Sequence, residues 1–170
     1  MNKKEELLYV GRKIVIGRSQ IHRLGAMAKK KIKRGEVIFL IKGKKKFWNA
    51  KNVKDSLYGK NWMGIGKNLW IIPVVGHGRY VNHSCDPSAS VIGRVTVVAL
   101  RDLSPGDEVT IDYSLVEGDP RWYMRCKCGS KNCRKIIRSV NFLPKNIFNK
   151  YKNFMPVYFR NLYIKNHKSH

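Results

Sequence analysis

No stretch of the 170-residue sequence is apolar over the length that a membrane-spanning helix needs. The first eight residues, Met-Asn-Lys-Lys-Glu-Glu-Leu-Leu, are charged and contain no secretory apolar region. Internal repeats are absent, as are low-complexity segments apart from lysine clusters. These absences predict an intracellular protein without membrane association, in cytoplasm, nucleoid or nucleus, where thiols stay reduced.

Acidic residues are scarce and unevenly distributed. The chain has 35 Lys and Arg but only 11 Asp and Glu, for a net charge of +24. The net charge is +14 over residues 1–60, −3 over 61–120 and +13 over 121–170, where acidic residues are lacking altogether. Two interpretations stay open. One is a lysine-rich bias that serves solubility. The other is a pair of basic ends that bind nucleic acid, around a middle that faces a basic substrate.

Cysteine is also rare, with four residues that leave none over: Cys85, Cys126, Cys128 and Cys133. The last three form a Cys-x-Cys-x4-Cys run, in which Gly129 permits a turn. A tetrahedral zinc ion takes four thiolates at about 2.3 Å each, which these four can supply. The alternatives are two disulfides, which a reducing compartment disfavours, or four inert buried thiols.

The residues that are present predict a β-rich single domain. Hydrophobic residues make up 43% of the chain, enough for a core. A lysine-rich, poorly periodic stretch over 42–60 indicates a solvated insertion with room for one helical turn. Apolar residues at helical spacing before Pro156 predict a helix, followed by a second over 157–164. Short β-branched runs predict strands over 10–16, 37–41, 69–73, 91–100 (a pair around a Gly-Arg turn) and 109–113.

One stretch, Arg79 to Pro87, concentrates polar and reactive side chains in the order Arg-Tyr-Val-Asn-His-Ser-Cys-Asp-Pro. Alone, it is typical of a strand end that enters an Asx-type turn. A second block, Gly106 to Tyr113, reads Gly-Asp-Glu-Val-Thr-Ile-Asp-Tyr, and the cysteine run follows it. In order and spacing, the three blocks resemble the SET-domain protein lysine methyltransferases that carry a post-SET zinc segment. The resemblance covers roughly residues 14–138.

The resemblance implies a fold and a set of ligands. We expect a mainly β SET fold of several small sheets with a knot-like crossing over residues 10–120, a post-SET zinc-binding segment over 121–138, and a C-terminal helical extension over 139–170. S-adenosylmethionine is the implied methyl donor. One structural zinc is implied, with the four cysteines as its ligands.

The resemblance also implies roles for single residues. Tyr113 is expected at the point of methyl transfer, where it orients the amine and the sulfonium methyl. Asn82 and His83 are expected to recognise the cofactor, and the backbone around Leu24 and Gly25 to cradle it. Tyr80 and Ile111 are expected to line the substrate channel. The cofactor's positive charge and desolvation lower the pKa of a target lysine below its ordinary value of about 10.4, so placement matters more than acid–base power.

Four positions depart from the family pattern. Arg23 and Lys135 stand where glycine is usual, Met27 stands where Phe is common, and Ile111 stands before Asp-Tyr where Phe or Tyr is common. Because Ile111 offers no hydroxyl to retain a water beside the amine, we expect methylation beyond the first methyl group.

The sequence therefore predicts a monomeric protein-lysine N-methyltransferase. Its expected substrate is a basic, nucleic-acid-associated protein, histone-like or ribosomal, and its basic ends are expected to bind nucleic acid. The alternative is a non-catalytic zinc-containing module that binds basic proteins or nucleic acid. A zinc-ribbon-like nucleic-acid binder fits poorly, because the fourth cysteine is distant in the sequence.

Overall fold

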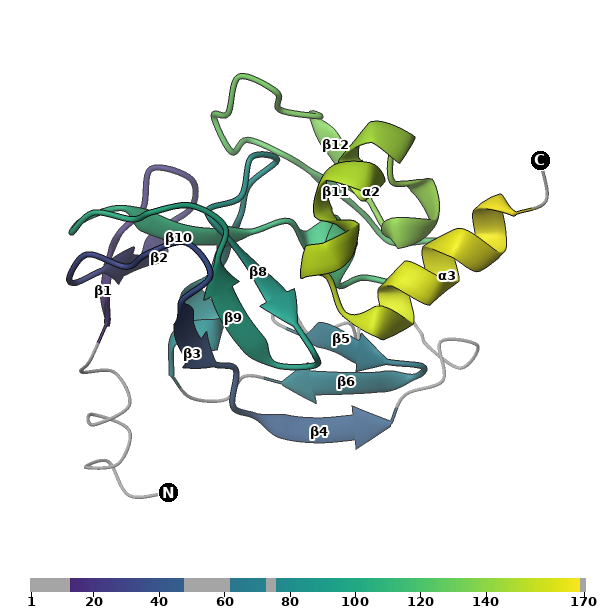
Figure 1. The fold of residues 1–170 in the computed structure, drawn as a ribbon, viewed down its shortest axis with the longest axis horizontal. Helices are drawn as coiled ribbons and strands as arrows, with labels where there is room; N and C mark the ends of the chain where they lie inside the picture. Colours follow the sequence, from purple (N-terminus) through teal and green to yellow (C-terminus); the bar gives the residue numbers. More distant parts are fainter. Residues whose placement is uncertain (1–12, 48–61, 73–75, 169–170) are drawn as a thin grey trace.

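The fold is a set of small sheets with a helical end (Figure 1), seen in a computed structural model that describes residues 13–47, 62–72 and 76–168. One sheet has the order β1-β2-β10-β7, a second β3-β9-β8, a third β4-β6-β5, and a ribbon pairs β11 with β12. The strands are β1 (Ile14–Arg18), β2 (Leu24–Ala28), β3 (Val37–Leu40), β4 (Lys44–Phe47), β5 (Met63–Gly66), β6 (Leu69–Ile72), β7 (Asn82–His83), β8 (Ala89–Ile92), β9 (Thr96–Ala99), β10 (Glu108–Ile111), β11 (Tyr123–Arg125) and β12 (Ile136–Arg138). The helical elements are the 3-10 turns η3 (His77–Tyr80), η4 (Tyr113–Leu115), η5 (Val140–Phe142) and η6 (Lys152–Phe154), with α2 (Lys145–Tyr151) and α3 (Val157–His167). The mainly β class and the helical C-terminal end are thus confirmed.

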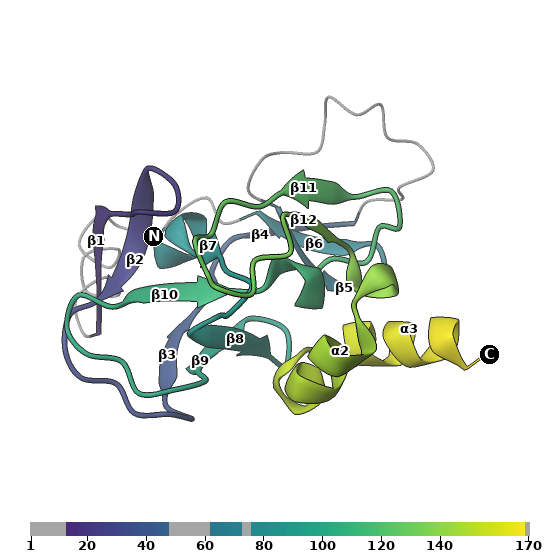
Figure 2. The ribbon, with the colours of Figure 1, turned by 90° about the horizontal axis from the view of Figure 1, so that it is seen from above.

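The four-stranded sheet brings the two polar sequence blocks together. β10 runs antiparallel to β2 and parallel to β7, with Thr110 opposite Asn82 and Ile111 opposite His83. Segments about 30 residues apart in the sequence therefore share one sheet, and the knot-like crossing between them stays a prediction. Figure 2 shows the loop between β11 and β12 reaching from the ribbon to the region of β7 and β10.

Most of the expected strands are present, with two corrections. The stretch over 42–60 is exposed at Lys44–Phe47, as expected, but it also forms a strand there that was not predicted: β4, an edge strand paired with β6. An edge strand tolerates lysines because its side chains stay in water. The expected strand over 109–113 ends at Ile111, because the Asp112 side chain accepts a hydrogen bond from the Ser114 N–H and caps η4. Residues 10–12, 48–60 and 73 of these expectations lie outside the described residues.

The main hydrophobic core is shared between the sheets and the C-terminal helices. Phe159 of α3 is 1% exposed, and Gly64 of β5 makes room for its ring. A second cluster contains Cys85, Cys126 and Ile137, and Tyr113 packs against both clusters. Tyr113 therefore lies at the junction of the sheets and the cysteine segment. Within the described ranges, no helix combines the length and apolar character that a bilayer span requires.

Candidate functional site

The side chain of Asn82 is the centre of a polar network at the end of the β1–β2 hairpin. Its Nδ2 lies 2.7 Å from Glu108 Oε1, 3.0 Å from the Leu24 carbonyl oxygen and 3.1 Å from Ser19 Oγ. The Ser19 hydroxyl in turn donates to Glu108 Oε2 at 2.9 Å. Three segments distant in the sequence therefore meet at one amide group. Sequence reasoning singled out Asn82 but missed Glu108, whose role depends on the pairing of β10 with β2.

Strand β2 can lie this close to the Glu108 carboxylate because residue 25 is glycine. A Cβ on Gly25 would lie 2.3 Å from Glu108 Oε1, far inside contact distance. Leu24, the other residue expected to cradle a cofactor, keeps its side chain 45% exposed and offers its carbonyl to Asn82. Arg23 has a φ of 46°, in the left-handed region that glycine adopts without a steric penalty. The turn thus keeps a glycine-like backbone at Arg23 without the glycine.

Tyr113 is held from both ends. Its hydroxyl donates to the Val81 carbonyl at 2.7 Å, and its backbone N–H donates to His83 Nδ1 at 3.2 Å. Burial, and after it the Glu108 carboxylate, raises the pKa of the Tyr113 phenol. The phenol therefore stays protonated at neutral pH and acts as a hydrogen-bond donor. That state suits orientation of a substrate better than abstraction of a proton.

The two residues expected in the substrate channel have different surroundings. Tyr80 ends η3 and is half-buried, and Val81 separates it from the strand that carries Asn82. Ile111 is 4% exposed, belongs to the main core and lies opposite His83. Their channel roles stay predictions.

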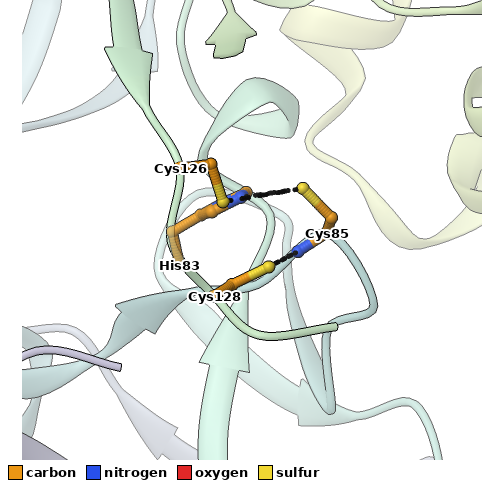
Figure 3. Close-up of side chains that lie close together, drawn as sticks. All are labelled: His83, Cys85, Cys126 and Cys128. Carbon is orange, nitrogen blue, oxygen red and sulfur yellow. Dashed lines mark hydrogen bonds between the residues drawn. The ribbon is translucent and has the colours of Figure 1, made fainter. Parts of the chain in front are cut away.

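Three cysteines and one histidine form the tightest cluster of potential metal ligands among the described residues (Figure 3). One donor atom from each of His83, Cys85, Cys126 and Cys128 lies within 4.8 Å of the other three. All four cysteines are free thiols, so the disulfide alternative does not match this structure. The Sγ atoms of Cys85 and Cys126 lie 3.8 Å apart. Two thiolates at about 2.3 Å from a tetrahedral zinc would be separated by about 3.8 Å, so the donor set fits zinc.

Cys133, the fourth predicted ligand, lies at the edge of this group. It packs against the same small cluster, and its thiol faces the Cys126 carbonyl with Sγ 3.6 Å from the oxygen. His83 occupies the group instead, with Nε2 3.4 Å from Cys85 Sγ. Because His83 Nδ1 accepts from the Tyr113 N–H, the ring proton belongs on Nε2. Burial lowers the pKa of His83 to about 4, although Asp112 opposes the shift, so the ring is neutral.

The protonation of the thiols is uneven. Burial raises the pKa of the Cys85 and Cys126 thiols. Burial also disfavours the Cys128 thiolate, but hydrogen bonds from the Cys85 N–H and from Ser130 outweigh it and lower the pKa of Cys128. A divalent cation would favour the thiolate of all three, since thiols lose their protons on zinc binding.

Arg134 connects the cysteine segment to the residue before Tyr113. Its Nη2 lies 2.6 Å from Asp112 Oδ1, and its Nε and backbone N each lie 3.3 Å from Cys85 Sγ. Sequence reasoning missed Arg134 as the partner of Asp112, because a residue 22 positions later gives no local signal. Lys135, which follows, has a φ of 62° and lies in a tight turn closed by the Ile136 N–H and the Arg134 carbonyl, 2.6 Å apart.

The acidic side chains of residues 61–120 are all engaged within the protein. Within the site, hydrogen bonds are accepted by Glu108 and Asp112. In the loop that follows, they are accepted by Glu117 and Asp119. The exposed ones cap turns or pair with a lysine: Asp86 pairs with Lys150, Asp102 accepts from the Arg34 N–H, and Asp107 accepts from the Ser104 N–H. The acidic middle of the sequence is therefore largely internal, and it provides less acidic surface for a basic substrate than its net charge suggests.

Comparison with known proteins identifies the family. The SET domain profile matches residues 23–114, more than half of the chain. The chain belongs to the SET-domain family. Among its curated relatives, the histone-lysine N-methyltransferase TRX1 of Oryza sativa subsp. japonica is 28% identical over 145 residues. The H3 lysine-4 specific histone-lysine N-methyltransferase of Saccharomyces cerevisiae is 29% identical over 140 residues.

These alignments cover 76% and 73% of this chain but only 14% and 13% of the two relatives. The chain thus spans about one seventh of the length of these two relatives. Among solved structures, the crystal structure of KRYPTONITE in complex with mCHG DNA and SAH superposes with a TM-score of 0.57 at 21% identity. That match covers 72% of this chain and 28% of the other, and it supports the SET fold.

Proposed function

We propose that this chain is a protein-lysine N-methyltransferase that uses S-adenosylmethionine. The observation that carries the proposal is the parallel pairing of β7 with β10, which brings Tyr113 next to the Asn82 network: its hydroxyl donates to the carbonyl of Val81, the residue before Asn82. Relatives named as histone-lysine N-methyltransferases share most of this region with the chain.

The residues of the site divide into two tasks. Asn82, the Leu24 carbonyl and the Glu108 carboxylate form a polar wall whose oxygens suit an ammonium group, such as the α-amino group of S-adenosylmethionine. The cofactor would supply a methyl group on a sulfonium. Tyr113 supplies a neutral hydroxyl that orients the incoming amine, while His83 holds the Tyr113 backbone. Placement of this kind raises the rate by aligning the reacting groups.

For the metal, we propose one structural zinc per chain. Cys85, Cys126 and Cys128 are already gathered around one point, and Cys133 remains the predicted fourth ligand. The zinc would fasten the loop between β11 and β12 to the chain after β7. It has no part in methyl transfer itself.

For the substrate, we propose a basic, histone-like or ribosomal protein inside the cell. The support comes from the relatives, two of which are named for histones, rather than from a free acidic surface. Ile111 carries no hydroxyl and is buried beside His83, so we expect di- or trimethylated product.

For a second partner, we propose nucleic acid. The described part of residues 121–168 has no acidic residue, and Arg125, Lys127 and Lys135 line a hollow beside Gly129 and Ser130. None of these three cations forms an ion pair in the described part of the chain. Such a surface would repel a basic tail and attract phosphates.

The test is methyl transfer by the purified chain. Labelled S-adenosylmethionine is supplied with histone H3, ribosomal proteins and a lysine-free control peptide, and mass spectrometry locates the label. We expect label on lysine, lost in Tyr113→Phe. A folded protein that binds the cofactor or zinc but transfers no methyl group to any acceptor would overturn the proposal and favour the non-catalytic module. Monomethyl product alone at long times would overturn the expectation from Ile111.

A further inference from the structure

Resting on the proposed function, we infer that Arg134 is a positioning residue. It couples the docking of the cysteine segment to the alignment of Tyr113, so that neither is maintained without the other. Arg134 belongs to the loop between β11 and β12, whereas Asp112 and Cys85 belong to the two central blocks. One guanidinium contacts both of them. These contacts join the segment that carries three of the four cysteines to two other places in the chain. One is Asp112, the residue before Tyr113, and the other is Cys85, which follows β7.

The contact with Asp112 acts directly on the start of η4. The Asp112 side chain is fully buried, and its Oδ1 accepts from Arg134 Nη2 at 2.6 Å and from the Ser114 N–H at 3.0 Å. Its Oδ2 makes no hydrogen bond to any described residue. Arg134 is the cation closest to this buried carboxylate, since His83 Nδ1 lies 3.6 Å from the same oxygen. Without Arg134, the Asp112 carboxylate would be buried without a cation, which is strongly unfavourable. Asp112 would then tend to move toward solvent, and the hydrogen bond by which it caps η4 and fixes the backbone of Tyr113 would be lost.

The contact with Cys85 closes a ring of interactions. Arg134 donates to Cys85 Sγ from both Nε and the backbone N, and His83 Nε2 lies 3.4 Å from the same sulfur. The other ring nitrogen of His83 accepts from the Tyr113 N–H. The ring therefore runs from Arg134 through Asp112, Tyr113, His83 and Cys85 back to Arg134. Hydrogen bonds to a thiolate also orient it as a metal ligand, so Arg134 serves the zinc site and Tyr113 together.

Arginine suits this position for a geometric reason. The guanidinium is planar and holds Nε and Nη2 at a fixed separation, so it can donate to a thiol and a carboxylate at once. A lysine ammonium carries the charge but cannot keep both directions on a flexible stem. The 17% exposure of the Arg134 side chain leaves little room for water to replace the lost donor.

The experiment compares Arg134→Gln, Arg134→Lys, Asp112→Asn and the double variant Arg134→Gln/Asp112→Asn. The matched control is Arg94→Gln, an exposed arginine in the β8–β9 turn that forms no ion pair with a described residue. The readouts are amide hydrogen exchange at residues 112–115 and 126–138, zinc retention against a chelating dye, and kcat with KM for S-adenosylmethionine.

We expect Arg134→Gln to speed exchange in both segments by about tenfold or more and to lower kcat by a similar factor. KM for the cofactor should change by less than about twofold, because the Asn82 network is untouched. Asp112→Asn should change exchange and kcat by similar factors. The double variant should lose no more than either single variant, because both substitutions break the same interaction. Arg134→Lys should show a smaller loss than Arg134→Gln. Arg94→Gln should match the wild type.

Additive effects of the two substitutions, or unchanged exchange at residues 112–115, would overturn the inference and leave Arg134 as an ordinary ion pair. If Arg134→Gln does not fold, Arg134→Lys and Asp112→Asn decide by the same exchange measurement. If the wild type transfers no methyl group, the proposed function fails, while exchange and zinc retention still decide whether the two segments are coupled.

Discussion

At the scale of single residues, Tyr113 has the sharpest assignment. Its hydroxyl already donates a hydrogen bond, and its backbone is fixed by His83. We expect Tyr113→Phe to lower kcat by about 100-fold or more, because orientation is lost only where the reaction occurs. The affinity for S-adenosylmethionine, measured by calorimetry, should be nearly unchanged.

Asn82→Ala is the contrasting variant, because Asn82 belongs to the proposed cofactor wall and not to the proposed transfer point. It should weaken cofactor binding first, with a smaller loss of kcat at saturation. If Tyr113→Phe turned over at a near-normal rate, Tyr113 would only be a packing residue between the two clusters.

Two further residues carry backbone strain that a glycine would remove. Arg23 and Lys135 have positive φ, which costs a side-chain-bearing residue about 1 kcal/mol or more. We expect Lys135→Gly to raise the free energy of unfolding by about 0.5 to 1 kcal/mol in urea titration, since the added freedom of the unfolded chain offsets part of the gain. Arg23→Gly should behave alike. The control is Lys127→Gly, at a position without positive φ, and a gain there as large as at Lys135 would contradict the explanation.

At the scale of elements, the loop after η4 contains a buried acid with a testable titration. Burial raises the pKa of Glu117 from its ordinary 4.5 to about 7, although hydrogen bonds from the backbone of residues 118 and 119 oppose the shift. The folded chain therefore holds this proton more tightly than the unfolded chain does. The contribution of Glu117 to stability is greatest below about pH 4.5 and is lost as the pH rises to about 7.

Glu117→Gln removes this titration while keeping an acceptor for the Asp119 N–H. Between pH 5 and pH 8, the wild type should lose about 2 to 3 kcal/mol of stability relative to the variant. Urea unfolding of both proteins at the two pH values measures the difference. A constant difference across that range would show that Glu117 is ionised in the folded state at pH 5.

The cysteine segment is the second element with a clear expectation. Cys128→Ser removes a proposed zinc ligand, so elemental analysis should fall from one equivalent of zinc per chain. The amide hydrogens of residues 120–138 should exchange faster. Activity should fall strongly, whereas the midpoint of thermal unfolding should change little, because the main core lies elsewhere. Asn132→Ser, in the same loop, is the control. A wild type that folds well without zinc would contradict the metal assignment.

At the scale of the whole molecule, the charge distribution predicts binding to nucleic acid. Duplex DNA binding should weaken steeply with salt, and Lys127→Ala or Lys131→Ala should each reduce the slope by about one released counterion. Arg94→Ala, in the middle of the chain, should leave the slope unchanged. Methylation of a basic protein should rise when that protein is presented on DNA. No binding to DNA or RNA even at low salt would leave the charge as a compositional bias.

Much of the architecture was predictable because it depends on local patterns. The β-branched runs became β3, β6 and the β8–β9 hairpin, and the apolar spacing around Pro156 became α2 and α3. Lys44–Phe47 was missed because its strand character comes from pairing with β6 and not from its own side chains. The end of β10 was misjudged because Asp112 turns the chain by capping η4.

Three motif blocks in order were enough to indicate the family and to single out the residues that could act chemically: Asn82, His83, Tyr113 and the four cysteines. How these residues are connected became visible with the folded chain. Glu108 meets Asn82 through strand pairing, His83 joins the cysteine cluster, and Arg134 reaches Asp112 and Cys85 from a separate segment. The physical reason is that motifs record which groups a site needs, whereas hydrogen bonds and buried ion pairs depend on distances between segments that the linear order does not contain.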